Sequence, residues 1–263
     1  MKKIKILIAN PAGNITIFVL DHFDPSQYQA IASQLLAMKE LKGEQVAFAA
    51  GENTMHMCGM EFCGNASRAF ALMTAQKQGV DGYGQVEINV SGCDQPLTVE
   101  VNTENHFTRI EMPPPLSIER WKEGSLLRDA YLVDMDGIMH IVVRDMAPTL
   151  AHFNEIKDLV NKKFDPPAMG VMFYDTDTGV LTPVVYVKEV NTTYFEGSCG
   201  SGTTAIACAF SAGEPEGTYR FTLPQPAGTI TATVEKGQGK IKAVYIEGTV
   251  SLSEVMEVEV NTD

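Results

Sequence analysis

The chain has 263 residues, of which 44% are hydrophobic and 20% charged, a balance that suits one large or two smaller folded domains and argues against disorder and coiled coil. Its 33 acidic residues outnumber its 20 lysines and arginines, and a net charge of −13 disfavours a nucleic-acid partner because phosphates would be repelled. No apolar run reaches the roughly 18 residues of a membrane span, and the first one ends at Asn10 without a cleavage site, so we expect a cytoplasmic protein with no membrane partner.

Alternating apolar and polar residues predict strands along the whole chain. The predicted strands are 4–8, 15–20, 86–90, 97–101, 108–112, 130–133, 140–143, 184–187, 230–234 and 242–246. Helices are predicted at 27–38, capped by Ser26, at 66–78, ending at Gly79, and at 154–163 and 203–212. The second and fourth of these helices carry little polar surface, which is typical of buried helices. The sequence therefore predicts an α/β (α+β) fold in which two sheets each wrap around a central helix.

The run of three prolines at 113–115 is a stiff extended segment and marks the predicted domain boundary. We expect an N-terminal domain over 1–115, joined by a C-terminal strand at about 252–263, and a C-terminal domain over 116–251. Each half reaches a Cys-Gly pair at the start of its apolar helix, at Cys63-Gly64 and at Cys199-Gly200. This agreement suggests one structural plan used twice.

The cysteines do not predict a disulfide framework or a metal site. Their number is odd, and the chain is of moderate size. The spacing from Cys58 to Cys63 is wider than a zinc knuckle, and no second half-site matches it. Nucleotide-binding glycine motifs and the His-Glu-x-x-His metal motif are also missing from the sequence. We therefore expect neither a metal nor a cofactor.

A cysteine placed just before a helix lies where free backbone N–H groups and the helix dipole favour negative charge. We expect this position to lower the pKa of the thiol and to make it a usable base near neutral pH. The small residues that follow Cys63 and Cys199 let the backbone approach a ligand, and their N–H groups suit a carboxylate. Two such sites facing each other would allow one sulfur to remove an α-proton while the other delivers a proton to the opposite face, which is racemisation.

A buried cysteine is often only a small apolar side chain, and that is our interpretation of Cys93, Cys208 and Cys58. For Cys63 and Cys199, the paired placement before glycine and a helix, once in each half, favours a function instead.

The two cysteine motifs resemble the catalytic signatures of the diaminopimelate epimerase superfamily. The motifs are Phe62-Cys63-Gly64-Asn65-Ala66 and Ser198-Cys199-Gly200-Ser201-Gly202-Thr203, accompanied by Gly13-Asn14, Glu44-Gln45 and Gln225-Pro226-Ala227-Gly228. The resemblance implies a racemase or epimerase that needs no pyridoxal phosphate, with two pseudo-symmetric domains and the active site in the cleft between them. It implies Cys63 and Cys199 as the acid–base pair. The implied substrate-binding residues are Asn14, Gln45, Gly64, Asn65, Gly200 and Ser201.

Departures from the epimerase pattern argue against diaminopimelate as the substrate. Diaminopimelate epimerases carry a Glu-Arg pair before the second cysteine, which helps to hold the far end of the substrate. Val190 and Asn191 stand at those positions here. A second charged amino-acid group would therefore find no arginine partner, and burying it unpaired would be costly.

The motifs are most similar to the histidine racemase branch of that superfamily, which implies interconversion of L- and D-histidine. In that branch Glu44 and Glu196 would lie beside the two thiols, where each could bind the substrate or act as a proton relay; the alternative for both is an ordinary solvated carboxylate. His140 follows a histidine position of the family, and we expect a structural role for it.

Three other functions remain open from the sequence. The first is an epimerase or racemase of another amino acid, diaminopimelate included. The second is a non-catalytic amino-acid-binding protein of the same fold, and the third is a thiol redox sensor. Family members are often dimers, so a homodimer is also left open.

Overall fold

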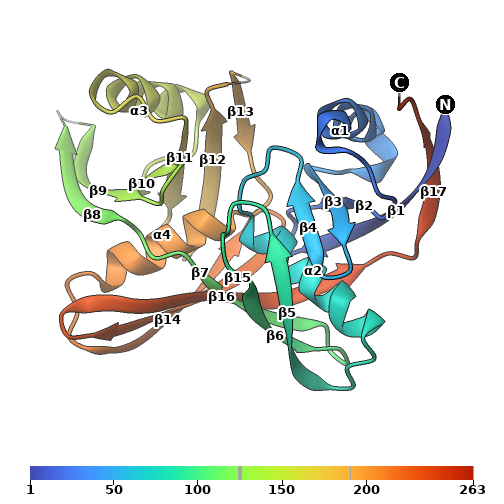
Figure 1. Cartoon of the computed structure of the whole chain (residues 1–263). Coiled ribbons are helices and arrows are strands. Elements are labelled where there is room, and N and C mark those ends of the chain that lie inside the picture. Colours follow the sequence, from blue (N-terminus) through green and yellow to red (C-terminus); the bar gives the residue numbers. More distant parts are fainter. Residues whose placement is uncertain (124–125, 190, 263) are drawn as a thin grey trace. The chain divides into compact units, whose positions relative to one another are not determined.

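The computed structural model describes residues 1–123, 126–189 and 191–262 of the chain (Figure 1). It divides into two compact units, of which unit 1 contains Met1–Glu111 and Glu247–Asp263, and unit 2 contains Met112–Ile246. The chain ends thus belong to the same unit. The sequence analysis predicted these two boundaries after residues 115 and 251, which is four and five residues further along the chain.

Unit 1 is built on a sheet with the strand order β7-β6-β5-β4-β3-β2-β1-β17. The strands are β1 Lys2–Pro11, β2 Thr16–Val19, β3 Gln45–Gly51, β4 Thr54–Met57, β5 Tyr83–Val90, β6 Leu97–Asn102, β7 Phe107–Met112 and β17 Met256–Val260. β2 and β4 run parallel to β3 and β5, respectively, and β17 pairs antiparallel with β1. The C-terminal strand therefore completes the sheet that the first strand begins.

The helix α2, Gly64–Lys77, lies against β1, β5 and β6 (Figure 1). Most of its residues are buried, and many are alanines, which bring the helix close to the strands. A shorter helix, α1 (Tyr28–Ala37), packs on β3 and carries Ile31 and Leu35 into the apolar core of this unit. The 3-10 turns Pro25–Gln27 and Lys39–Leu41 flank α1.

The start of α1 differs from the sequence-based prediction, because Ser26 does not cap the helix. Asp24 is the capping residue of the 3-10 turn Pro25–Gln27, and its carboxylate accepts a hydrogen bond from the Ser26 backbone N–H at 2.9 Å. The proline at the start of this turn suits the first helical position, since it has no N–H to satisfy. The α-helix proper then begins at Tyr28.

Unit 2 contains a six-stranded sheet with the order β13-β12-β11-β10-β9-β8. Its strands are β8 Ser117–Glu123, β9 Leu127–Asp134, β10 Met139–Arg144, β11 Ala168–Tyr174, β12 Leu181–Val187 and β13 Thr192–Phe195. Three further strands follow, β14 Gly217–Gln225, β15 Gly228–Gly237 and β16 Lys240–Leu252, the last of which continues into unit 1. The helix α3, Leu150–Lys163, connects the parallel strands β10 and β11 and packs on β11.

The helix α4, Gly200–Ser211, contacts β9, β10 and β11 of the six-stranded sheet and also the hairpin of β14 and β15. Nearly all of its residues are buried. Strands from two sides thus enclose α4, and this explains why its sequence is small and apolar all round. Each unit consequently holds one buried helix that begins directly after a cysteine.

Candidate active site

Cys63 is the N-cap residue of α2. Its backbone is extended, with φ −130° and ψ 108°, and its sulfur accepts a hydrogen bond from the Ala66 N–H at 3.5 Å. Its carbonyl oxygen accepts one from the Ser67 hydroxyl at 2.8 Å. The thiol thus occupies the position that a serine or aspartate side chain takes at an ordinary helix start.

Two predicted substrate-binding residues lie around Cys63. The amide of Gln45, at the start of β3, is next to the sulfur, with Nε2 at 3.4 Å and Oε1 at 3.5 Å. The same Nε2 donates to Oδ1 of Asn14 and to the hydroxyl of Thr16, both at 2.8 Å. Because an amide offers both a donor and an acceptor, Gln45 can bind either the thiol or the thiolate form.

Asn14 connects the other predicted residues of unit 1. Its Nδ2 donates to Oε2 of Glu44 at 2.9 Å, and its Oδ1 also accepts from Nδ2 of Asn65 at 3.4 Å. Asn14 and Asn65 are both buried, so these hydrogen bonds satisfy amides that would otherwise be costly to bury. The structure thus brings Asn14, Glu44, Gln45, Cys63 and Asn65 together.

Cys199 repeats this geometry at the start of α4. Its φ of −131° and ψ of 116° nearly equal those of Cys63, and its sulfur accepts from the Gly202 N–H at 3.3 Å. The hydroxyl of Thr203 donates to its carbonyl oxygen, as Ser67 does in unit 1. The two units therefore present a thiol at a helix start in the same local conformation.

A glutamine that the sequence analysis noted only as part of a motif holds the second cysteine. Gln225, at the end of β14, is buried. Its Oε1 accepts from the Cys199 backbone N–H at 2.8 Å, and its Nε2 donates to the Thr203 hydroxyl at 2.9 Å. Gln225 thereby fixes the Cys199 peptide to the hairpin of β14 and β15.

Ser201 joins Cys199 to a buried histidine. Its Oγ lies 3.5 Å from the Cys199 sulfur and 3.0 Å from Nε2 of His140, which is on β10. Burial lowers the pKa of His140 to about 4, so its ring is neutral at neutral pH. A neutral ring can orient the Ser201 hydroxyl, but it brings no positive charge to the site at that pH. His140 was expected to have a structural role, and its contact with Ser201 gives that role a specific partner.

The predicted lowering of the thiol pKa is wrong for Cys199. Burial, and secondly the negative charge of Glu196, raise the pKa of Cys199 well above its usual range. The hydrogen bonds from Ser201 and Gly202 act in the opposite direction with smaller effect. Cys199 therefore carries its proton at neutral pH, and Glu196 lies beside it as the sequence analysis expected.

The remaining cysteines have other surroundings. Cys208 is fully buried in α4, and burial raises its pKa to about 12. Cys58 is partly buried, its thiol donates to the Gln29 side chain, and burial raises its pKa as well. Within the described ranges no cluster of three or more His, Cys, Asp or Glu side chains could hold a metal ion. Over the same ranges, none of the helices has both the length and the apolar character of a membrane span.

The positions that distinguish the chain from diaminopimelate epimerases are only partly described, since Val190 lies outside the described residues. Asn191 adopts a φ of 47° in the turn before β13, and its Oδ1 accepts a hydrogen bond from the Tyr186 hydroxyl at 3.1 Å. The side chain that stands in place of the arginine is thus uncharged and already bonded within unit 2.

The turn after β5 supports the segment that leads to Cys63. The Ser91 hydroxyl donates to the Glu61 carbonyl and accepts from the Met57 N–H, both at 2.8 Å. Gly92 has a φ of 74°, and a Cβ there would lie 2.8 Å from the Glu61 carbonyl carbon and still closer to the Phe62 nitrogen. Only glycine fits this close backbone approach.

Gly92→Ala is therefore expected to reduce the free energy of unfolding by about 2 kcal/mol or more, because it adds a backbone clash to an unfavourable φ. Gly239→Ala is the matched control, since Gly239 has a φ of 71° but open space around the position of its Cβ. Chemical denaturation of both variants measures the difference. Equal losses would show that the contact with Phe62 does not matter.

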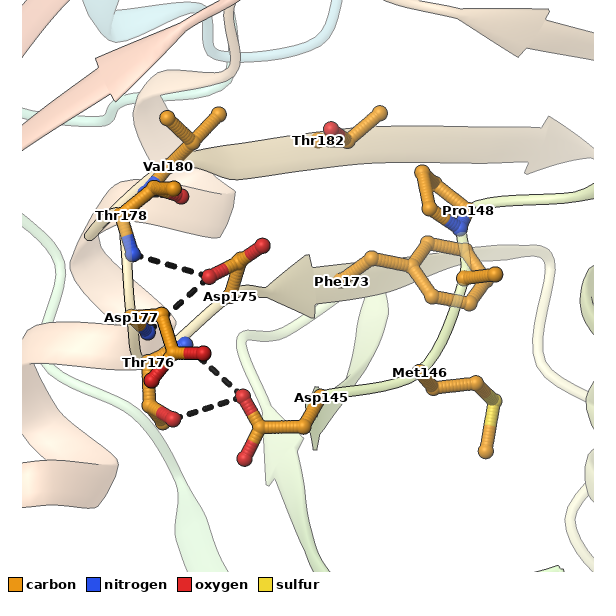
Figure 2. Close-up of a pocket in the computed structure, with 11 residues that line it drawn as sticks. Asp145, Met146, Pro148, Phe173, Asp175, Thr176, Asp177, Thr178, Val180 and Thr182 are labelled. Atoms are coloured by element: carbon orange, nitrogen blue, oxygen red, sulfur yellow. Dashed lines mark hydrogen bonds between the residues drawn. The ribbon is translucent and has the colours of Figure 1, made fainter.

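A separate cavity of about 570 Å³ lies in unit 2. The residues that line it come from the segments after β10 and β11 (Figure 2). The Thr176 N–H and hydroxyl both donate to Oδ1 of Asp145, and the N–H groups of Asp177 and Thr178 donate to Oδ1 of Asp175. These carboxylates thus order the turn that lines the cavity. None of the sequence-predicted site residues lines it.

A family model described as the histidine racemase CntK N-terminal domain matches residues 3–256. The chain belongs to this histidine racemase family. A histidine racemase of Fusobacterium nucleatum is 37% identical over 212 residues, which cover 75% of this chain and 77% of the relative. The matched range therefore spans almost the whole chain and contains both Cys63 and Cys199.

Solved structures show the fold that this family member adopts. A PhzC/PhzF protein of Clostridium difficile matches with a TM-score of 0.63 and 13% identity, covering 98% of this chain and all of that chain. A hydroxyproline epimerase of Agrobacterium vitis, solved with bound trans-4-hydroxy-L-proline, matches with a TM-score of 0.65 and 11% identity, covering 97% and 92%. The mixed α/β fold is thus shown. These likenesses do not single out diaminopimelate epimerases, so membership in that superfamily stays a prediction.

Proposed function

We propose that this member of the histidine racemase family interconverts L- and D-histidine with Cys63 and Cys199 as its two acid–base groups and without a cofactor. The observation that carries the proposal is the repeated helix start, in which each unit places a thiol at the N-cap of a buried helix with the same backbone conformation. The family membership of the chain supports the choice of histidine.

The proposal requires the two helix starts to face each other across the substrate, as they would in the diaminopimelate epimerase superfamily. The α-carboxylate would bind the backbone N–H groups of Gly64, Asn65, Gly200 and Ser201. Negative charge builds on this carboxylate as the α-proton leaves, and the positive ends of both helix dipoles stabilise it. One sulfur removes the α-proton while the other delivers a proton to the opposite face.

The surroundings of the sulfurs suit opposite protonation states. Cys199 is buried beside Glu196 and holds its proton, so it can deliver one. The sulfur of Cys63 accepts hydrogen bonds from the Gln45 amide and the Ala66 N–H, which suit a thiolate that removes a proton. Glu44, held by Asn14, would bind the ammonium or imidazole of the substrate, and Glu196 would act as a relay for Cys199.

The substrate would be an amino acid with only one pair of α-ammonium and α-carboxylate groups, unlike diaminopimelate, which has two. Asn191 offers no positive charge for a second carboxylate, and its Oδ1 is already bonded to Tyr186. The same proposal places the enzyme in the cytoplasm with an amino acid as its small-molecule partner, and with no nucleic-acid or membrane partner. Sedimentation of the purified chain tests whether it forms a homodimer.

Incubation of the purified chain with L-histidine in D₂O tests the function. We expect D-histidine to form and deuterium to enter the α-position. Chiral chromatography measures the D-histidine, and NMR measures the deuterium. Exchange only with another amino acid, such as diaminopimelate or proline, would overturn the choice of histidine. Binding of histidine without exchange at the α-carbon would identify an amino-acid-binding protein instead.

A further inference from the structure

Arg68 is a buried charged residue that the sequence analysis did not single out. It lies on α2, five residues after Cys63, and it is among the largest side chains that are fully buried. Burying a guanidinium costs a large free energy unless an anion compensates its charge. Its position therefore calls for a negative group nearby.

The hydrogen bonds of Arg68 orient the guanidinium without neutralising it. Nη2 donates to Oδ1 of Asn65 at 3.0 Å, and Nη1 donates to the Gly248 carbonyl at 3.1 Å and to the Thr108 hydroxyl at 3.4 Å. All three acceptors are neutral oxygens. Nε is buried and has no hydrogen-bond partner within the described part of the chain.

Two acidic groups, Cys63 and Glu247, counteract the effect of burial on the pKa of Arg68. Burial lowers the pKa of Arg68 to about 10, which still leaves it positively charged at neutral pH. Glu247 is shared with a second cation, since its Oε2 lies 3.5 Å from Nε of Arg109. The Cys63 sulfur is joined to Arg68 by a chain of hydrogen bonds through Asn65, Asn14 and Gln45, so it is a second acidic group that the buried cation can stabilise as an anion.

Resting on the two-thiol function proposed above, we propose that Arg68 is a positioning residue whose buried positive charge keeps Cys63 ionised in the substrate-free enzyme. Electrostatic attraction is mutual, so the group that stabilises the cation is itself stabilised as an anion. Arg68 also fixes the side chain of Asn65, and through it that of Asn14. The buried charge thus belongs to the same hydrogen-bond network as the residues around Cys63. The substrate-free enzyme then holds a thiolate at Cys63 and a thiol at Cys199.

The rate at which iodoacetamide alkylates Cys63 reports the thiolate directly, because the thiolate is the nucleophile. We would measure this rate from pH 5 to pH 10 without substrate, with peptide mass spectrometry locating the adduct. In the wild-type chain the rate is expected to reach half its maximum below pH 8.5, the usual value for a free thiol. Arg68→Met should reduce the rate at pH 7 by about tenfold or more.

Two variants separate charge from packing. Arg68→Lys retains the positive charge and should restore most of the alkylation rate, whereas Arg120→Met removes an exposed arginine and should leave the rate close to that of the wild type. A folded Arg68→Met chain with an unchanged alkylation profile would overturn the proposal. Thermal unfolding shows which variants are folded.

The wild-type profile can overturn the proposal even if Arg68→Met does not fold, since a half-maximum at or above pH 8.5 would contradict an ionised Cys63. The readout needs no substrate. A chain that proves to racemise another amino acid, or only to bind one, would still give the same alkylation profile if Arg68 acts as proposed. Failure of the histidine assignment and failure of this inference are therefore distinguishable.

Discussion

Cys63→Ser and Cys199→Ser are each expected to reduce the formation of D-histidine from L-histidine at least about a thousandfold, within the range that a positioned acid or base contributes. A serine hydroxyl retains the shape of the side chain and can still accept the helix N–H. Its pKa is far above that of a thiol, so it neither removes nor delivers the α-proton at a useful rate. The initial rate of D-histidine formation measures the loss.

Exchange of the α-proton in D₂O then separates the two roles. Each variant retains one thiol, so it should still exchange the α-proton of one enantiomer slowly, and the two variants should favour opposite enantiomers. Cys58→Ser is the control, because that thiol bonds to Gln29 and has no place in the proposed chemistry. Racemisation that persists at more than a tenth of the wild-type rate in either variant would contradict the two-thiol mechanism.

Acid is expected to destabilise unit 2 through His140. The folded-state pKa of His140 is about 4, against an ordinary value of 6.5, because the ring is fully buried. The unfolded chain therefore binds more protons between these pH values, and stability rises with pH in this window. The contribution is fully present above about pH 6.5, falls as the pH drops toward 4, and amounts to roughly 3 kcal/mol.

Urea denaturation at pH 7.5 and pH 4.5 measures this contribution. His140→Gln removes the titrating ring but keeps a hydrogen-bonding group near Ser201, so this variant should lose less stability than the wild type between the two pH values. His22→Gln is the control, since His22 is exposed and should leave the pH dependence unchanged. Equal acid losses in the wild type and in His140→Gln would show that another group is responsible.

Local patterns predicted the elements that carry the cysteines, but not where those elements begin. The sequence analysis starts the two central helices at Ala66 and Thr203, whereas α2 begins at Gly64 and α4 at Gly200. Glycine has a low helix propensity, so a local interpretation excludes it. The cysteine caps and the surrounding strands override this preference, because burial of each helix outweighs the cost of the glycines in its first turn.

Strands without clear alternation were also missed. β3 combines alanines with apolar residues, and β8 is largely exposed and carries several charges, as befits the edge of a sheet. β11 lies inside the six-stranded sheet and is buried along most of its length, and its neighbour β12 was predicted only over residues 184–187. The apolar run of β11 resembles a buried helix as much as a strand, since periodicity alone does not separate the two.

The order of residues by itself determined which thiols stand at helix starts, because an N-cap, the small residues after it and the apolar helix are all contiguous in the chain. Only the tertiary structure decided how those thiols hold their protons. Cys199 keeps its proton since strands from distant parts of the sequence bury it beside Glu196, and this desolvation outweighs the helix start. Arg68 is likewise oriented by Thr108 and Gly248, far along the chain. Protonation depends on solvent exclusion and charge in three dimensions, which no local motif encodes.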